Sequence, residues 1–236
     1  MLSIVLCSKN YNNIDFLLEK TNLNKVDDII EIVIVLFKDS YKNTTNRKNI
    51  IIISGEKNGI YSSYNQGIKH SKNEYYLIVG DDDYLLHPVL LMNYFKNNLL
   101  THDMIFFSIK KNKKIVKGFN LNKIKTTILG IFPSHTCGTI IKKKLHEELG
   151  YYNLKYKLLA DQFFILMYFQ KKNKILYVDK YFFQVGNKGA SSNYIKSLDE
   201  LSEINNELKI NKKFIFLKPY LTLKRKFKIL WEKLKF

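Results

Sequence analysis

The chain has 236 residues, 46% of them hydrophobic, with 39 Lys and Arg against 21 Asp and Glu and a formal net charge of +18. This length and apolar fraction exclude a mainly disordered chain and suffice for a domain with a sizeable core. The presence of only 2 cysteines excludes a disulfide-rich secreted scaffold. No signal peptide or membrane-spanning run is evident, so we expect a cytoplasmic protein.

The first half of the chain alternates short β-branched apolar runs with helical patterns. We predict, in chain order, a strand over 2–7, a helix over 13–22, strands over 29–36 and 50–54, a helix over 59–71 and a strand over 75–79. Strand–helix–strand spacing of this kind predicts an α/β fold with a mostly parallel sheet flanked by helices. Ligands of such folds bind beyond the carboxyl ends of the strands.

The second half is less regular. We predict a hairpin over 104–109 and 115–119, a short helix over 142–149, an apolar helix over 159–171, strands over 176–178 and 182–185, and a helix with little core face over 197–209. The simplest organisation is one domain over residues 1–195, followed by a helical and basic extension over residues 196–236.

Three adjacent carboxylates, Asp81, Asp82 and Asp83, directly follow the strand predicted over 75–79. Without compensation they would repel one another and raise one another's pKa. A divalent cation with oxygen ligands removes this repulsion, and Mg²⁺ is typically held by one or two carboxylates together with substrate phosphates. A solvated acidic turn is the alternative, but the position at the end of a buried strand favours a cation site.

The segment around this triplet resembles the family 2 glycosyltransferases of the GT-A fold. The resemblance lies in NGIYSSYNQGI over 58–68 and NEYYLIVGDDD over 73–83. Further similar segments follow the family order: SIVLCSKNYNN, EIVIVLFKDS, PSHTCGTIIKKKLHEELGYYN and LLADQFF. The resemblance covers roughly residues 2–190 and does not extend to the C-terminal segment.

The resemblance implies a Rossmann-like GT-A fold and a metal-dependent transferase of the hexosyltransferase type. Such an enzyme moves a sugar, with inversion, from a nucleotide-sugar donor to an acceptor hydroxyl, using Mn²⁺ or Mg²⁺. It implies metal binding by Asp83, with Asp81 and His135 as further candidates, although a single histidine is often an ordinary polar residue. The donor-binding positions it implies are Ser8, Asn10, Asp39, Asn65, Asp82 and Lys188. A carboxylate at Asp39 would receive the nucleotide base, which favours a UDP-sugar.

Asp161, in LLADQFF, is the expected catalytic base. An inverting transfer needs a carboxylate that takes the proton of the acceptor hydroxyl as the new bond forms. The sequence neighbours of Asp161 are apolar, so we expect desolvation to raise its pKa. The alternative is an acid at the start of a helix that interacts favourably with the helix dipole.

Two positions depart from the family pattern. Lys57 and Ser62 stand where the family usually carries aspartates. Both lie on the nucleotide side of the expected site. They leave open which base is bound and whether the chain is an inactive relative.

The last 26 residues, 211–236, carry nine Lys and Arg against Glu232 alone. After Pro219, apolar residues recur every three or four positions between these cations, as in an amphipathic helix at an anionic membrane surface. We expect residues 214–236 to bind such a surface, with the protein peripheral on the inner face of the cytoplasmic membrane. The acceptor expected there is a lipid-linked saccharide in lipopolysaccharide or capsule biosynthesis. A helix packed on the domain is the alternative.

Two other classes remain as alternatives. A nucleotidyltransferase shares the parallel sheet and acidic site, but the first strand is not followed by a Gly-rich basic loop. A binding protein for acidic polymers or nucleic acid would explain the charge. Because most aromatic residues lie in apolar segments rather than among the cations, we expect no nucleic-acid partner. The sequence does not predict the oligomeric state.

Overall fold

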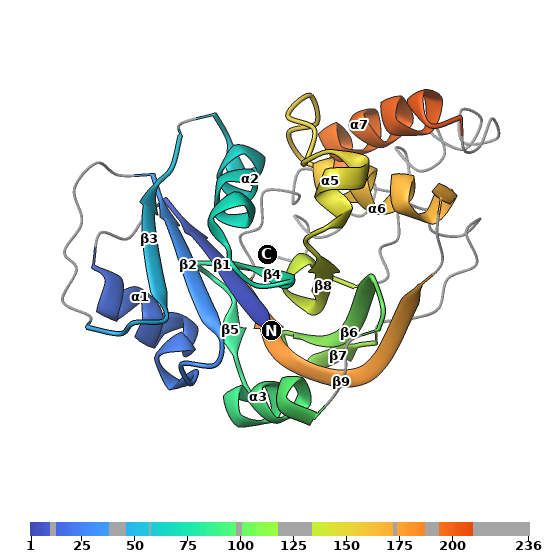
Figure 1. Cartoon of the computed structure of the whole chain (residues 1–236). Coiled ribbons are helices and arrows are strands. Elements are labelled where there is room, and N and C mark those ends of the chain that lie inside the picture. The colour runs from blue at the N-terminus through green and yellow to red at the C-terminus, as the bar shows by residue number, and fades with distance from the viewer. Residues whose placement is uncertain are drawn as a thin grey trace, which may run out of the picture.

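The computed structural model describes residues 1–9, 13–37, 46–56, 58–97, 101–117, 134–171, 174–186 and 194–209. These residues form one curled sheet with helices on both faces (Figure 1). The strands are β1 Leu2–Ser8, β2 Glu31–Leu36, β3 Ile50–Ser54, β4 Tyr75–Gly80, β5 Tyr84–Leu85, β6 Met104–Lys111, β7 Lys114–Val116, β8 Thr139–Lys142 and β9 Ile175–Val185. The α-helices are α1 Ile14–Thr21, α2 Ile60–His70, α3 Pro88–Asn97, α5 Leu145–Leu149, α6 Ala160–Lys171 and α7 Tyr194–Glu207.

The first four long strands form the parallel part of the sheet, in the order β3-β2-β1-β4. All residues of β1 and β2 are buried, as their continuous apolar sequences predict for strands covered on both faces. Ser8 pairs with Leu36, which pairs with Ser54, and Cys7 pairs with Gly80. The carboxyl ends of these strands therefore meet at one edge of the sheet, which confirms the predicted α/β class.

The sheet continues beyond β4 as β8-β6-β9-β5, with β8 antiparallel to both of its neighbours and β7 paired to β6. We predicted two short strands over 176–178 and 182–185, and the structure has the single strand β9. The polar residues Asp179 and Lys180 suggested an interruption, but both are exposed on this strand. Asp179 accepts hydrogen bonds from Ser108 (3.1 Å) and Lys117 (2.7 Å).

Strand β9 lies between β6 and β5 in the curled sheet. It pairs parallel with β6 from Ile175 to Val185, with shifts in register on the way, and near its end Phe183 and Gln184 also pair antiparallel with β5. Figure 1 shows β9 as a long bent ribbon that crosses below β6 and β7. Its last residues are thereby brought next to β5, which lies directly after the acidic triplet.

Alternate residues of the central strands build two separate cores. Val5 and Val33 face α2, α6 and α7, whereas Ile4 and Ile32 face α1 and α3. Figure 1 shows the same two groups of helices on opposite sides of the sheet. Successive side chains of a strand point to opposite faces of the sheet, so these continuously apolar strands can bury a helix layer on each face.

Helix α7 differs from the prediction of a helix with little core face. Leu198, Leu201 and Ile204 recur at three-residue spacing and are buried in the core that contains α2 and α6. The carboxylate of Glu200 accepts hydrogen bonds from the backbone N–H groups of residues 157, 158 and 159, at 2.8–2.9 Å. Helix α7 therefore supports the segment that leads into α6. The division at residue 195 stays a prediction.

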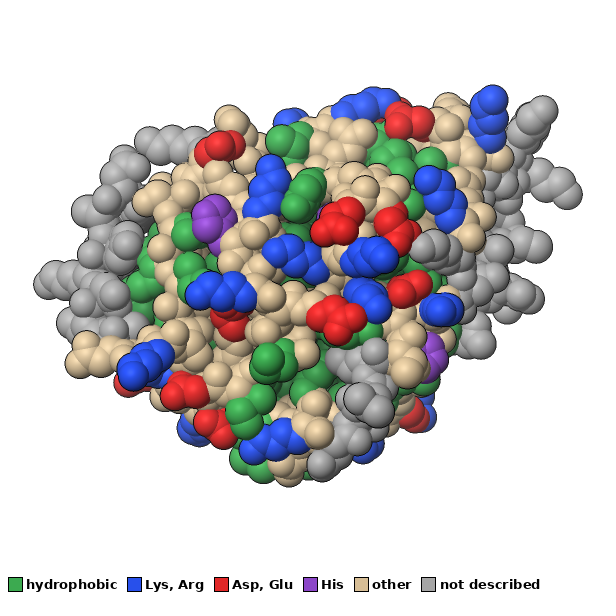
Figure 2. All heavy atoms as spheres, in the orientation of Figure 1, with side chains coloured by type: hydrophobic (Ala, Val, Ile, Leu, Met, Phe, Trp, Pro, Cys, Tyr) green, Lys and Arg blue, Asp and Glu red, His purple; other side chains and the backbone are tan. Residues whose placement is uncertain are grey.

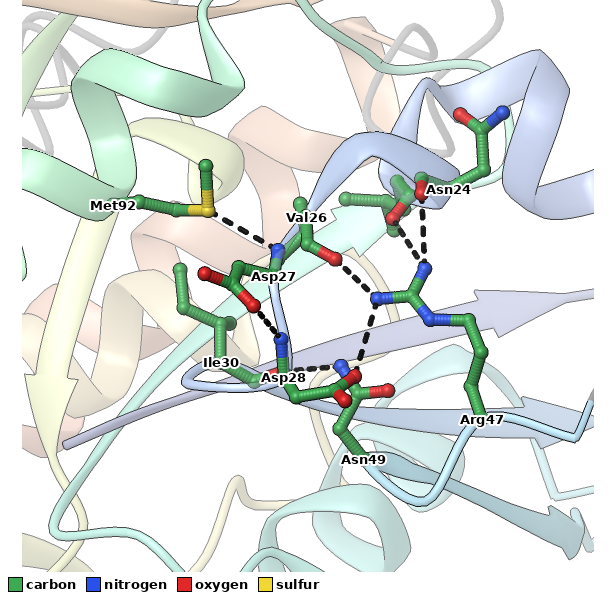
Figure 3. Close-up of polar contacts among 9 residues, drawn as sticks. Asn24, Val26, Asp27, Asp28, Ile30, Arg47, Asn49 and Met92 are labelled. Carbon is green, nitrogen blue, oxygen red and sulfur yellow. Dashed lines mark hydrogen bonds and ion pairs between the residues drawn. The ribbon is translucent and has the colours of Figure 1, made fainter.

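Arg47 connects the segment after α1 to the chain that enters β3 (Figure 3). Its guanidinium donates to the carbonyl oxygens of Leu23 (3.4 Å), Asn24 (3.1 Å) and Val26, and lies 3.9 Å from a carboxylate oxygen of Asp28. These contacts lie at the amino ends of β2 and β3, away from the edge where the carboxyl ends meet.

Helix α3 and strand β8 were not predicted from the sequence, and the helix predicted over 142–149 begins only at Leu145. Among the described residues, no helix combines the length and hydropathy needed to cross a membrane. On the face shown in Figure 2, basic and acidic side chains are interspersed. The predicted segment 211–236 lies outside the described residues.

Candidate active site

The acidic triplet forms a tight turn at the end of β4. The backbone N–H of Asp83 donates to the carbonyl of Gly80 (3.2 Å), and its carboxylate accepts hydrogen bonds from the N–H groups of Gly80 (2.9 Å) and Gly186 (3.1 Å). Asp83 is 5% exposed. Burial raises the pKa of its carboxyl group, while the nearby His135 and the two N–H donors oppose that rise. Asp83 is thus a buried carboxylate held in one orientation.

The other two acids of the triplet contact different elements. Ser8, at the end of β1, donates to Oδ2 of Asp81 (2.9 Å), and Lys20 donates to the carbonyl of Asp81 (2.7 Å). Asp82 lies against Gly186, where an added Cβ would be 2.6 Å from the Asp82 carbonyl oxygen. Only glycine permits this close approach of the end of β9 to the triplet. The structure therefore brings Ser8, predicted for donor binding, to the same edge as all three acids.

His135 and Cys137 complete a cluster of potential cation ligands with Asp83. One ligand atom from each of these residues lies within 4.8 Å of the others. Among the described residues, this is the group of three such side chains that could hold a metal ion. Asp81 is not part of it. The structure therefore brings His135 to Asp83, as predicted, and adds a thiol that the sequence analysis did not single out.

Asp161 is the second residue of α6 and interacts electrostatically with His135. Its Oδ1 accepts hydrogen bonds from the hydroxyl of Tyr61 (2.7 Å) and the N–H of Gln162 (2.9 Å), and its Oδ2 from Thr136 (3.3 Å). Burial raises the pKa of the Asp161 carboxyl group, and these donors together with the nearby His135 oppose the rise. The raised pKa agrees in direction with the expectation from the apolar sequence around it.

Helix α2 contacts Asp161 from a distant part of the chain. The Tyr61 hydroxyl is 2.7 Å from Asp161 and also donates to the carbonyl of Leu158 (2.8 Å), so one proton serves two acceptors. The side-chain amide of Asn65 binds both the N–H (3.0 Å) and the carbonyl (2.9 Å) of Tyr152. In this structure Asn65 braces the segment before α6. Its role in donor binding stays a prediction.

The sequence analysis missed the contact of Tyr61 with Asp161. Tyr61 belongs to the Gly-Ile-Tyr motif that carried the family resemblance, but no local pattern indicates a partner 100 residues later. Ser62, a departure from the family pattern, donates to Glu56 (3.1 Å). Three predicted donor-binding residues, Asn10, Asp39 and Lys188, lie outside the described residues, as does Lys57.

Several solved structures share this fold. S. aureus TarS 1–349 in complex with UDP-GlcNAc has a TM-score of 0.63 and 20% identity, covering 88% of this chain and 65% of that one. The mannosyltransferase PcManGT from Pyrobaculum calidifontis, in complex with GDP-Man and Mn²⁺, has a TM-score of 0.62 and 14% sequence identity. The match covers 93% of this chain and 71% of that one. Glucosyl-3-phosphoglycerate synthase from Mycobacterium tuberculosis, in complex with Mn²⁺, UDP-glucose and phosphoglyceric acid, has a TM-score of 0.58 and 11% sequence identity. The match covers 90% of this chain and 81% of that one.

The chain spans only 39% of the longer S. aureus TarS structure. A search for similar curated sequences found no match. The model of the family "Glycosyl transferase family 2", however, matches residues 3–174, which include β1 to β4, the acidic triplet, His135 and Asp161. The match covers well over half of the sequence and the curled α/β sheet is that of the GT-A fold, so this chain belongs to glycosyl transferase family 2.

Proposed function

We propose that this protein is an inverting, metal-dependent glycosyltransferase of the hexosyltransferase type. It moves a sugar from a UDP-sugar to a hydroxyl group of a lipid-linked saccharide in the biosynthesis of a cell-surface polysaccharide. One observation carries the proposal: His135 lies beside Asp83, which follows the carboxyl end of β4, and interacts electrostatically with both Asp83 and Asp161. Family membership favours this class over a nucleotidyltransferase.

The donor set at this edge fits a divalent cation. A buried carboxylate and an imidazole offer their ligand atoms within 4.8 Å of one another; carboxylate oxygen suits Mg²⁺ and Mn²⁺, and imidazole is a common ligand of divalent transition metals. A bound Mn²⁺ or Mg²⁺ would neutralise charge on the diphosphate leaving group. The relatives solved with UDP-GlcNAc, or with UDP-glucose and Mn²⁺, support a UDP-sugar and a metal. In the proposal, Asp82 contacts the ribose and Asp81 orients Ser8.

Asp161 acts as the general base. The oxygen of the acceptor hydroxyl bonds to the anomeric carbon, and its proton passes to a carboxylate oxygen of Asp161. The bond from the anomeric carbon to the phosphate oxygen breaks on the opposite side, and its electron pair leaves with the nucleoside diphosphate. Tyr61 and Thr136 hold the carboxylate in place by hydrogen bonds. Burial raises the pKa of Asp161 and so makes it a stronger base.

The test compares Asp161→Asn with the parent chain. Asn keeps the shape and can still accept the hydrogen bond from Tyr61. We expect a UDP-sugar with Mn²⁺ to raise the melting temperature of both proteins. Turnover in the variant should fall by about 10²–10⁴-fold, the usual contribution of a general base.

Asp15→Asn is the matched control, because Asp15 is also the second residue of a helix, α1. If both substitutions leave turnover unchanged, Asp161 is only a helix-terminal acid and the proposed mechanism is wrong. If no nucleotide or nucleotide sugar raises the melting temperature with or without Mn²⁺, the proposed donor is wrong.

We further propose that residues 214–236 hold the enzyme at an anionic membrane surface, where a lipid-linked acceptor is found. The support is the sequence pattern of apolar residues between Lys and Arg. Each cation near an anionic leaflet contributes about 1 kcal/mol. Replacing Lys224, Arg225 and Lys226 together by Gln should therefore release the full chain from anionic vesicles. Unchanged vesicle binding would contradict this part of the proposal.

A further inference from the structure

Cys137 places a thiol sulfur beside the carboxylate and imidazole of the proposed cation site. Its Sγ is 3.4 Å from Nδ1 of His135, and both residues offer ligand atoms within 4.8 Å of Asp83. Cys137 is 1% exposed and is not in a disulfide. Three different ligand types therefore lie within 4.8 Å of one another, next to the carboxyl end of β4.

The spacing of these atoms suits a shared cation. Zinc binds sulfur at about 2.3 Å and imidazole nitrogen at about 2.0 Å, so two such ligands at a tetrahedral angle lie about 3.5 Å apart. The observed separation of Sγ and Nδ1 is 3.4 Å. The N–H of Cys137 is 3.5 Å from the same Nδ1, which is a long hydrogen bond that a metal would readily replace.

The backbone around Cys137 is fixed by close packing. Residues Thr136–Gly138 form a single 3-10 turn, and an added Cβ on Gly138 would lie 2.7 Å from Cγ2 of Ile109. Ser134 donates to the carbonyl of Phe107 on β6 at 2.5 Å. The sulfur is therefore presented by a turn that packs closely against β6.

We propose that Cys137 is a ligand of the cation held by Asp83 and His135, which makes the site selective for cations that accept sulfur. Thiolate ligands favour Zn²⁺ and similar transition metals, whereas sites made only of oxygen ligands suit Mg²⁺ and Mn²⁺. This inference rests on the proposed function in one respect: it concerns the cation site that the proposed transferase would use. It predicts that Zn²⁺ or Co²⁺ is held by a metal–sulfur bond.

Cobalt absorption tests the sulfur directly, without any assay of sugar transfer. The full-length chain is titrated with Co²⁺, and the near-ultraviolet charge-transfer band of a cobalt–sulfur bond is recorded. The chain has only 2 cysteines, so Cys7→Ser is the matched control for Cys137→Ser. We expect the parent and Cys7→Ser to show the band and Cys137→Ser to lack it.

Affinities provide a second measurement. Loss of the sulfur should weaken Co²⁺ and Zn²⁺ binding by about tenfold or more and leave Mg²⁺ binding within about threefold. Equal weakening of all three cations, or a band that persists in Cys137→Ser, would overturn the proposal. So would bound Co²⁺ without a charge-transfer band in the parent chain. Circular dichroism and melting temperature establish that the variant is folded.

Failure of this inference is distinguishable from failure of the proposed function. If nucleotide sugars still raise the melting temperature and Asp161→Asn still abolishes turnover, while cobalt shows no sulfur band, the transferase stands and the thiol ligand does not. If the sulfur band is present but no nucleotide sugar binds, the metal site stands and the proposed donor does not.

Discussion

Removing one hydroxyl group, in Tyr61→Phe, should shift the pH dependence of the enzyme without removing its base. The Tyr61 hydroxyl donates to the Asp161 carboxylate at 2.7 Å and favours its ionised form. A hydrogen bond to a charged group contributes about 1.5–3 kcal/mol, and about 1.4 kcal/mol corresponds to one pKa unit. Because the same hydroxyl proton also donates to the carbonyl of Leu158, we expect the lower end of this energy range. Tyr61→Phe should therefore raise the pKa of Asp161 by about one unit.

Because Asp161 must be ionised to accept a proton, the rate should rise with pH through the pKa of Asp161. In Tyr61→Phe this acid limb should move to higher pH by the same amount, while the plateau at high pH changes less. The assay is release of UDP from the UDP-sugar that gives the largest thermal shift, measured across pH.

Tyr64→Phe is the matched control. Tyr64 lies on the same helix with its ring 5.6 Å from that of Tyr61, and it makes no hydrogen bond to Asp161. An acid limb that stays in place in Tyr61→Phe, or that moves equally in both variants, would refute the reasoning.

Three further substitutions test the supports of the site. Gly186→Ala should cost about 1–3 kcal/mol of stability, since the new methyl group would meet the Asp82 carbonyl, and cation affinity measured by titration should fall with it. Glu200→Ala removes the acceptor of three backbone N–H groups and should cost about 1–3 kcal/mol; turnover at saturating donor should fall while donor affinity persists. Arg47→Ala should lower the melting temperature through the loss of about 2 kcal/mol, yet leave the nucleotide-induced shift unchanged because Arg47 lies at the far ends of the strands.

The parallel half of the fold was predictable because its signals are local. Buried strands flanked by covering helices have continuous apolar sequences, as β1, β2 and β4 do, and the half-buried edge strand β3 shows the same local signal. The acidic triplet and Asp161 could be singled out for a similar reason: a triplet at a strand end and an acid in an apolar helix stand out within a few residues.

The rest of the architecture depends on contacts between distant segments. Strand β9 looked like two strands because its exposed Asp179 and Lys180 interrupt the apolar pattern where the sheet curls. The core face of α7 was overlooked because Leu198, Leu201 and Ile204 are few and separated by polar residues. Cys137 has no sequence signal as a potential ligand: Asp83 and His135 were expected from the family resemblance, but only the fold brings the thiol within 4.8 Å of their ligand atoms.

The hydrogen bonds that build the site join residues far apart along the chain. Tyr61 and Asp161 are separated by 100 positions, and Asp83 and Gly186 by 103. Pairings of such high contact order form only after large loops have closed, which is slow. A folding intermediate that contains only the parallel strands would have the acidic turn before Asp161 is in place. Recovery of transfer activity should therefore be among the last events of refolding, after recovery of secondary structure.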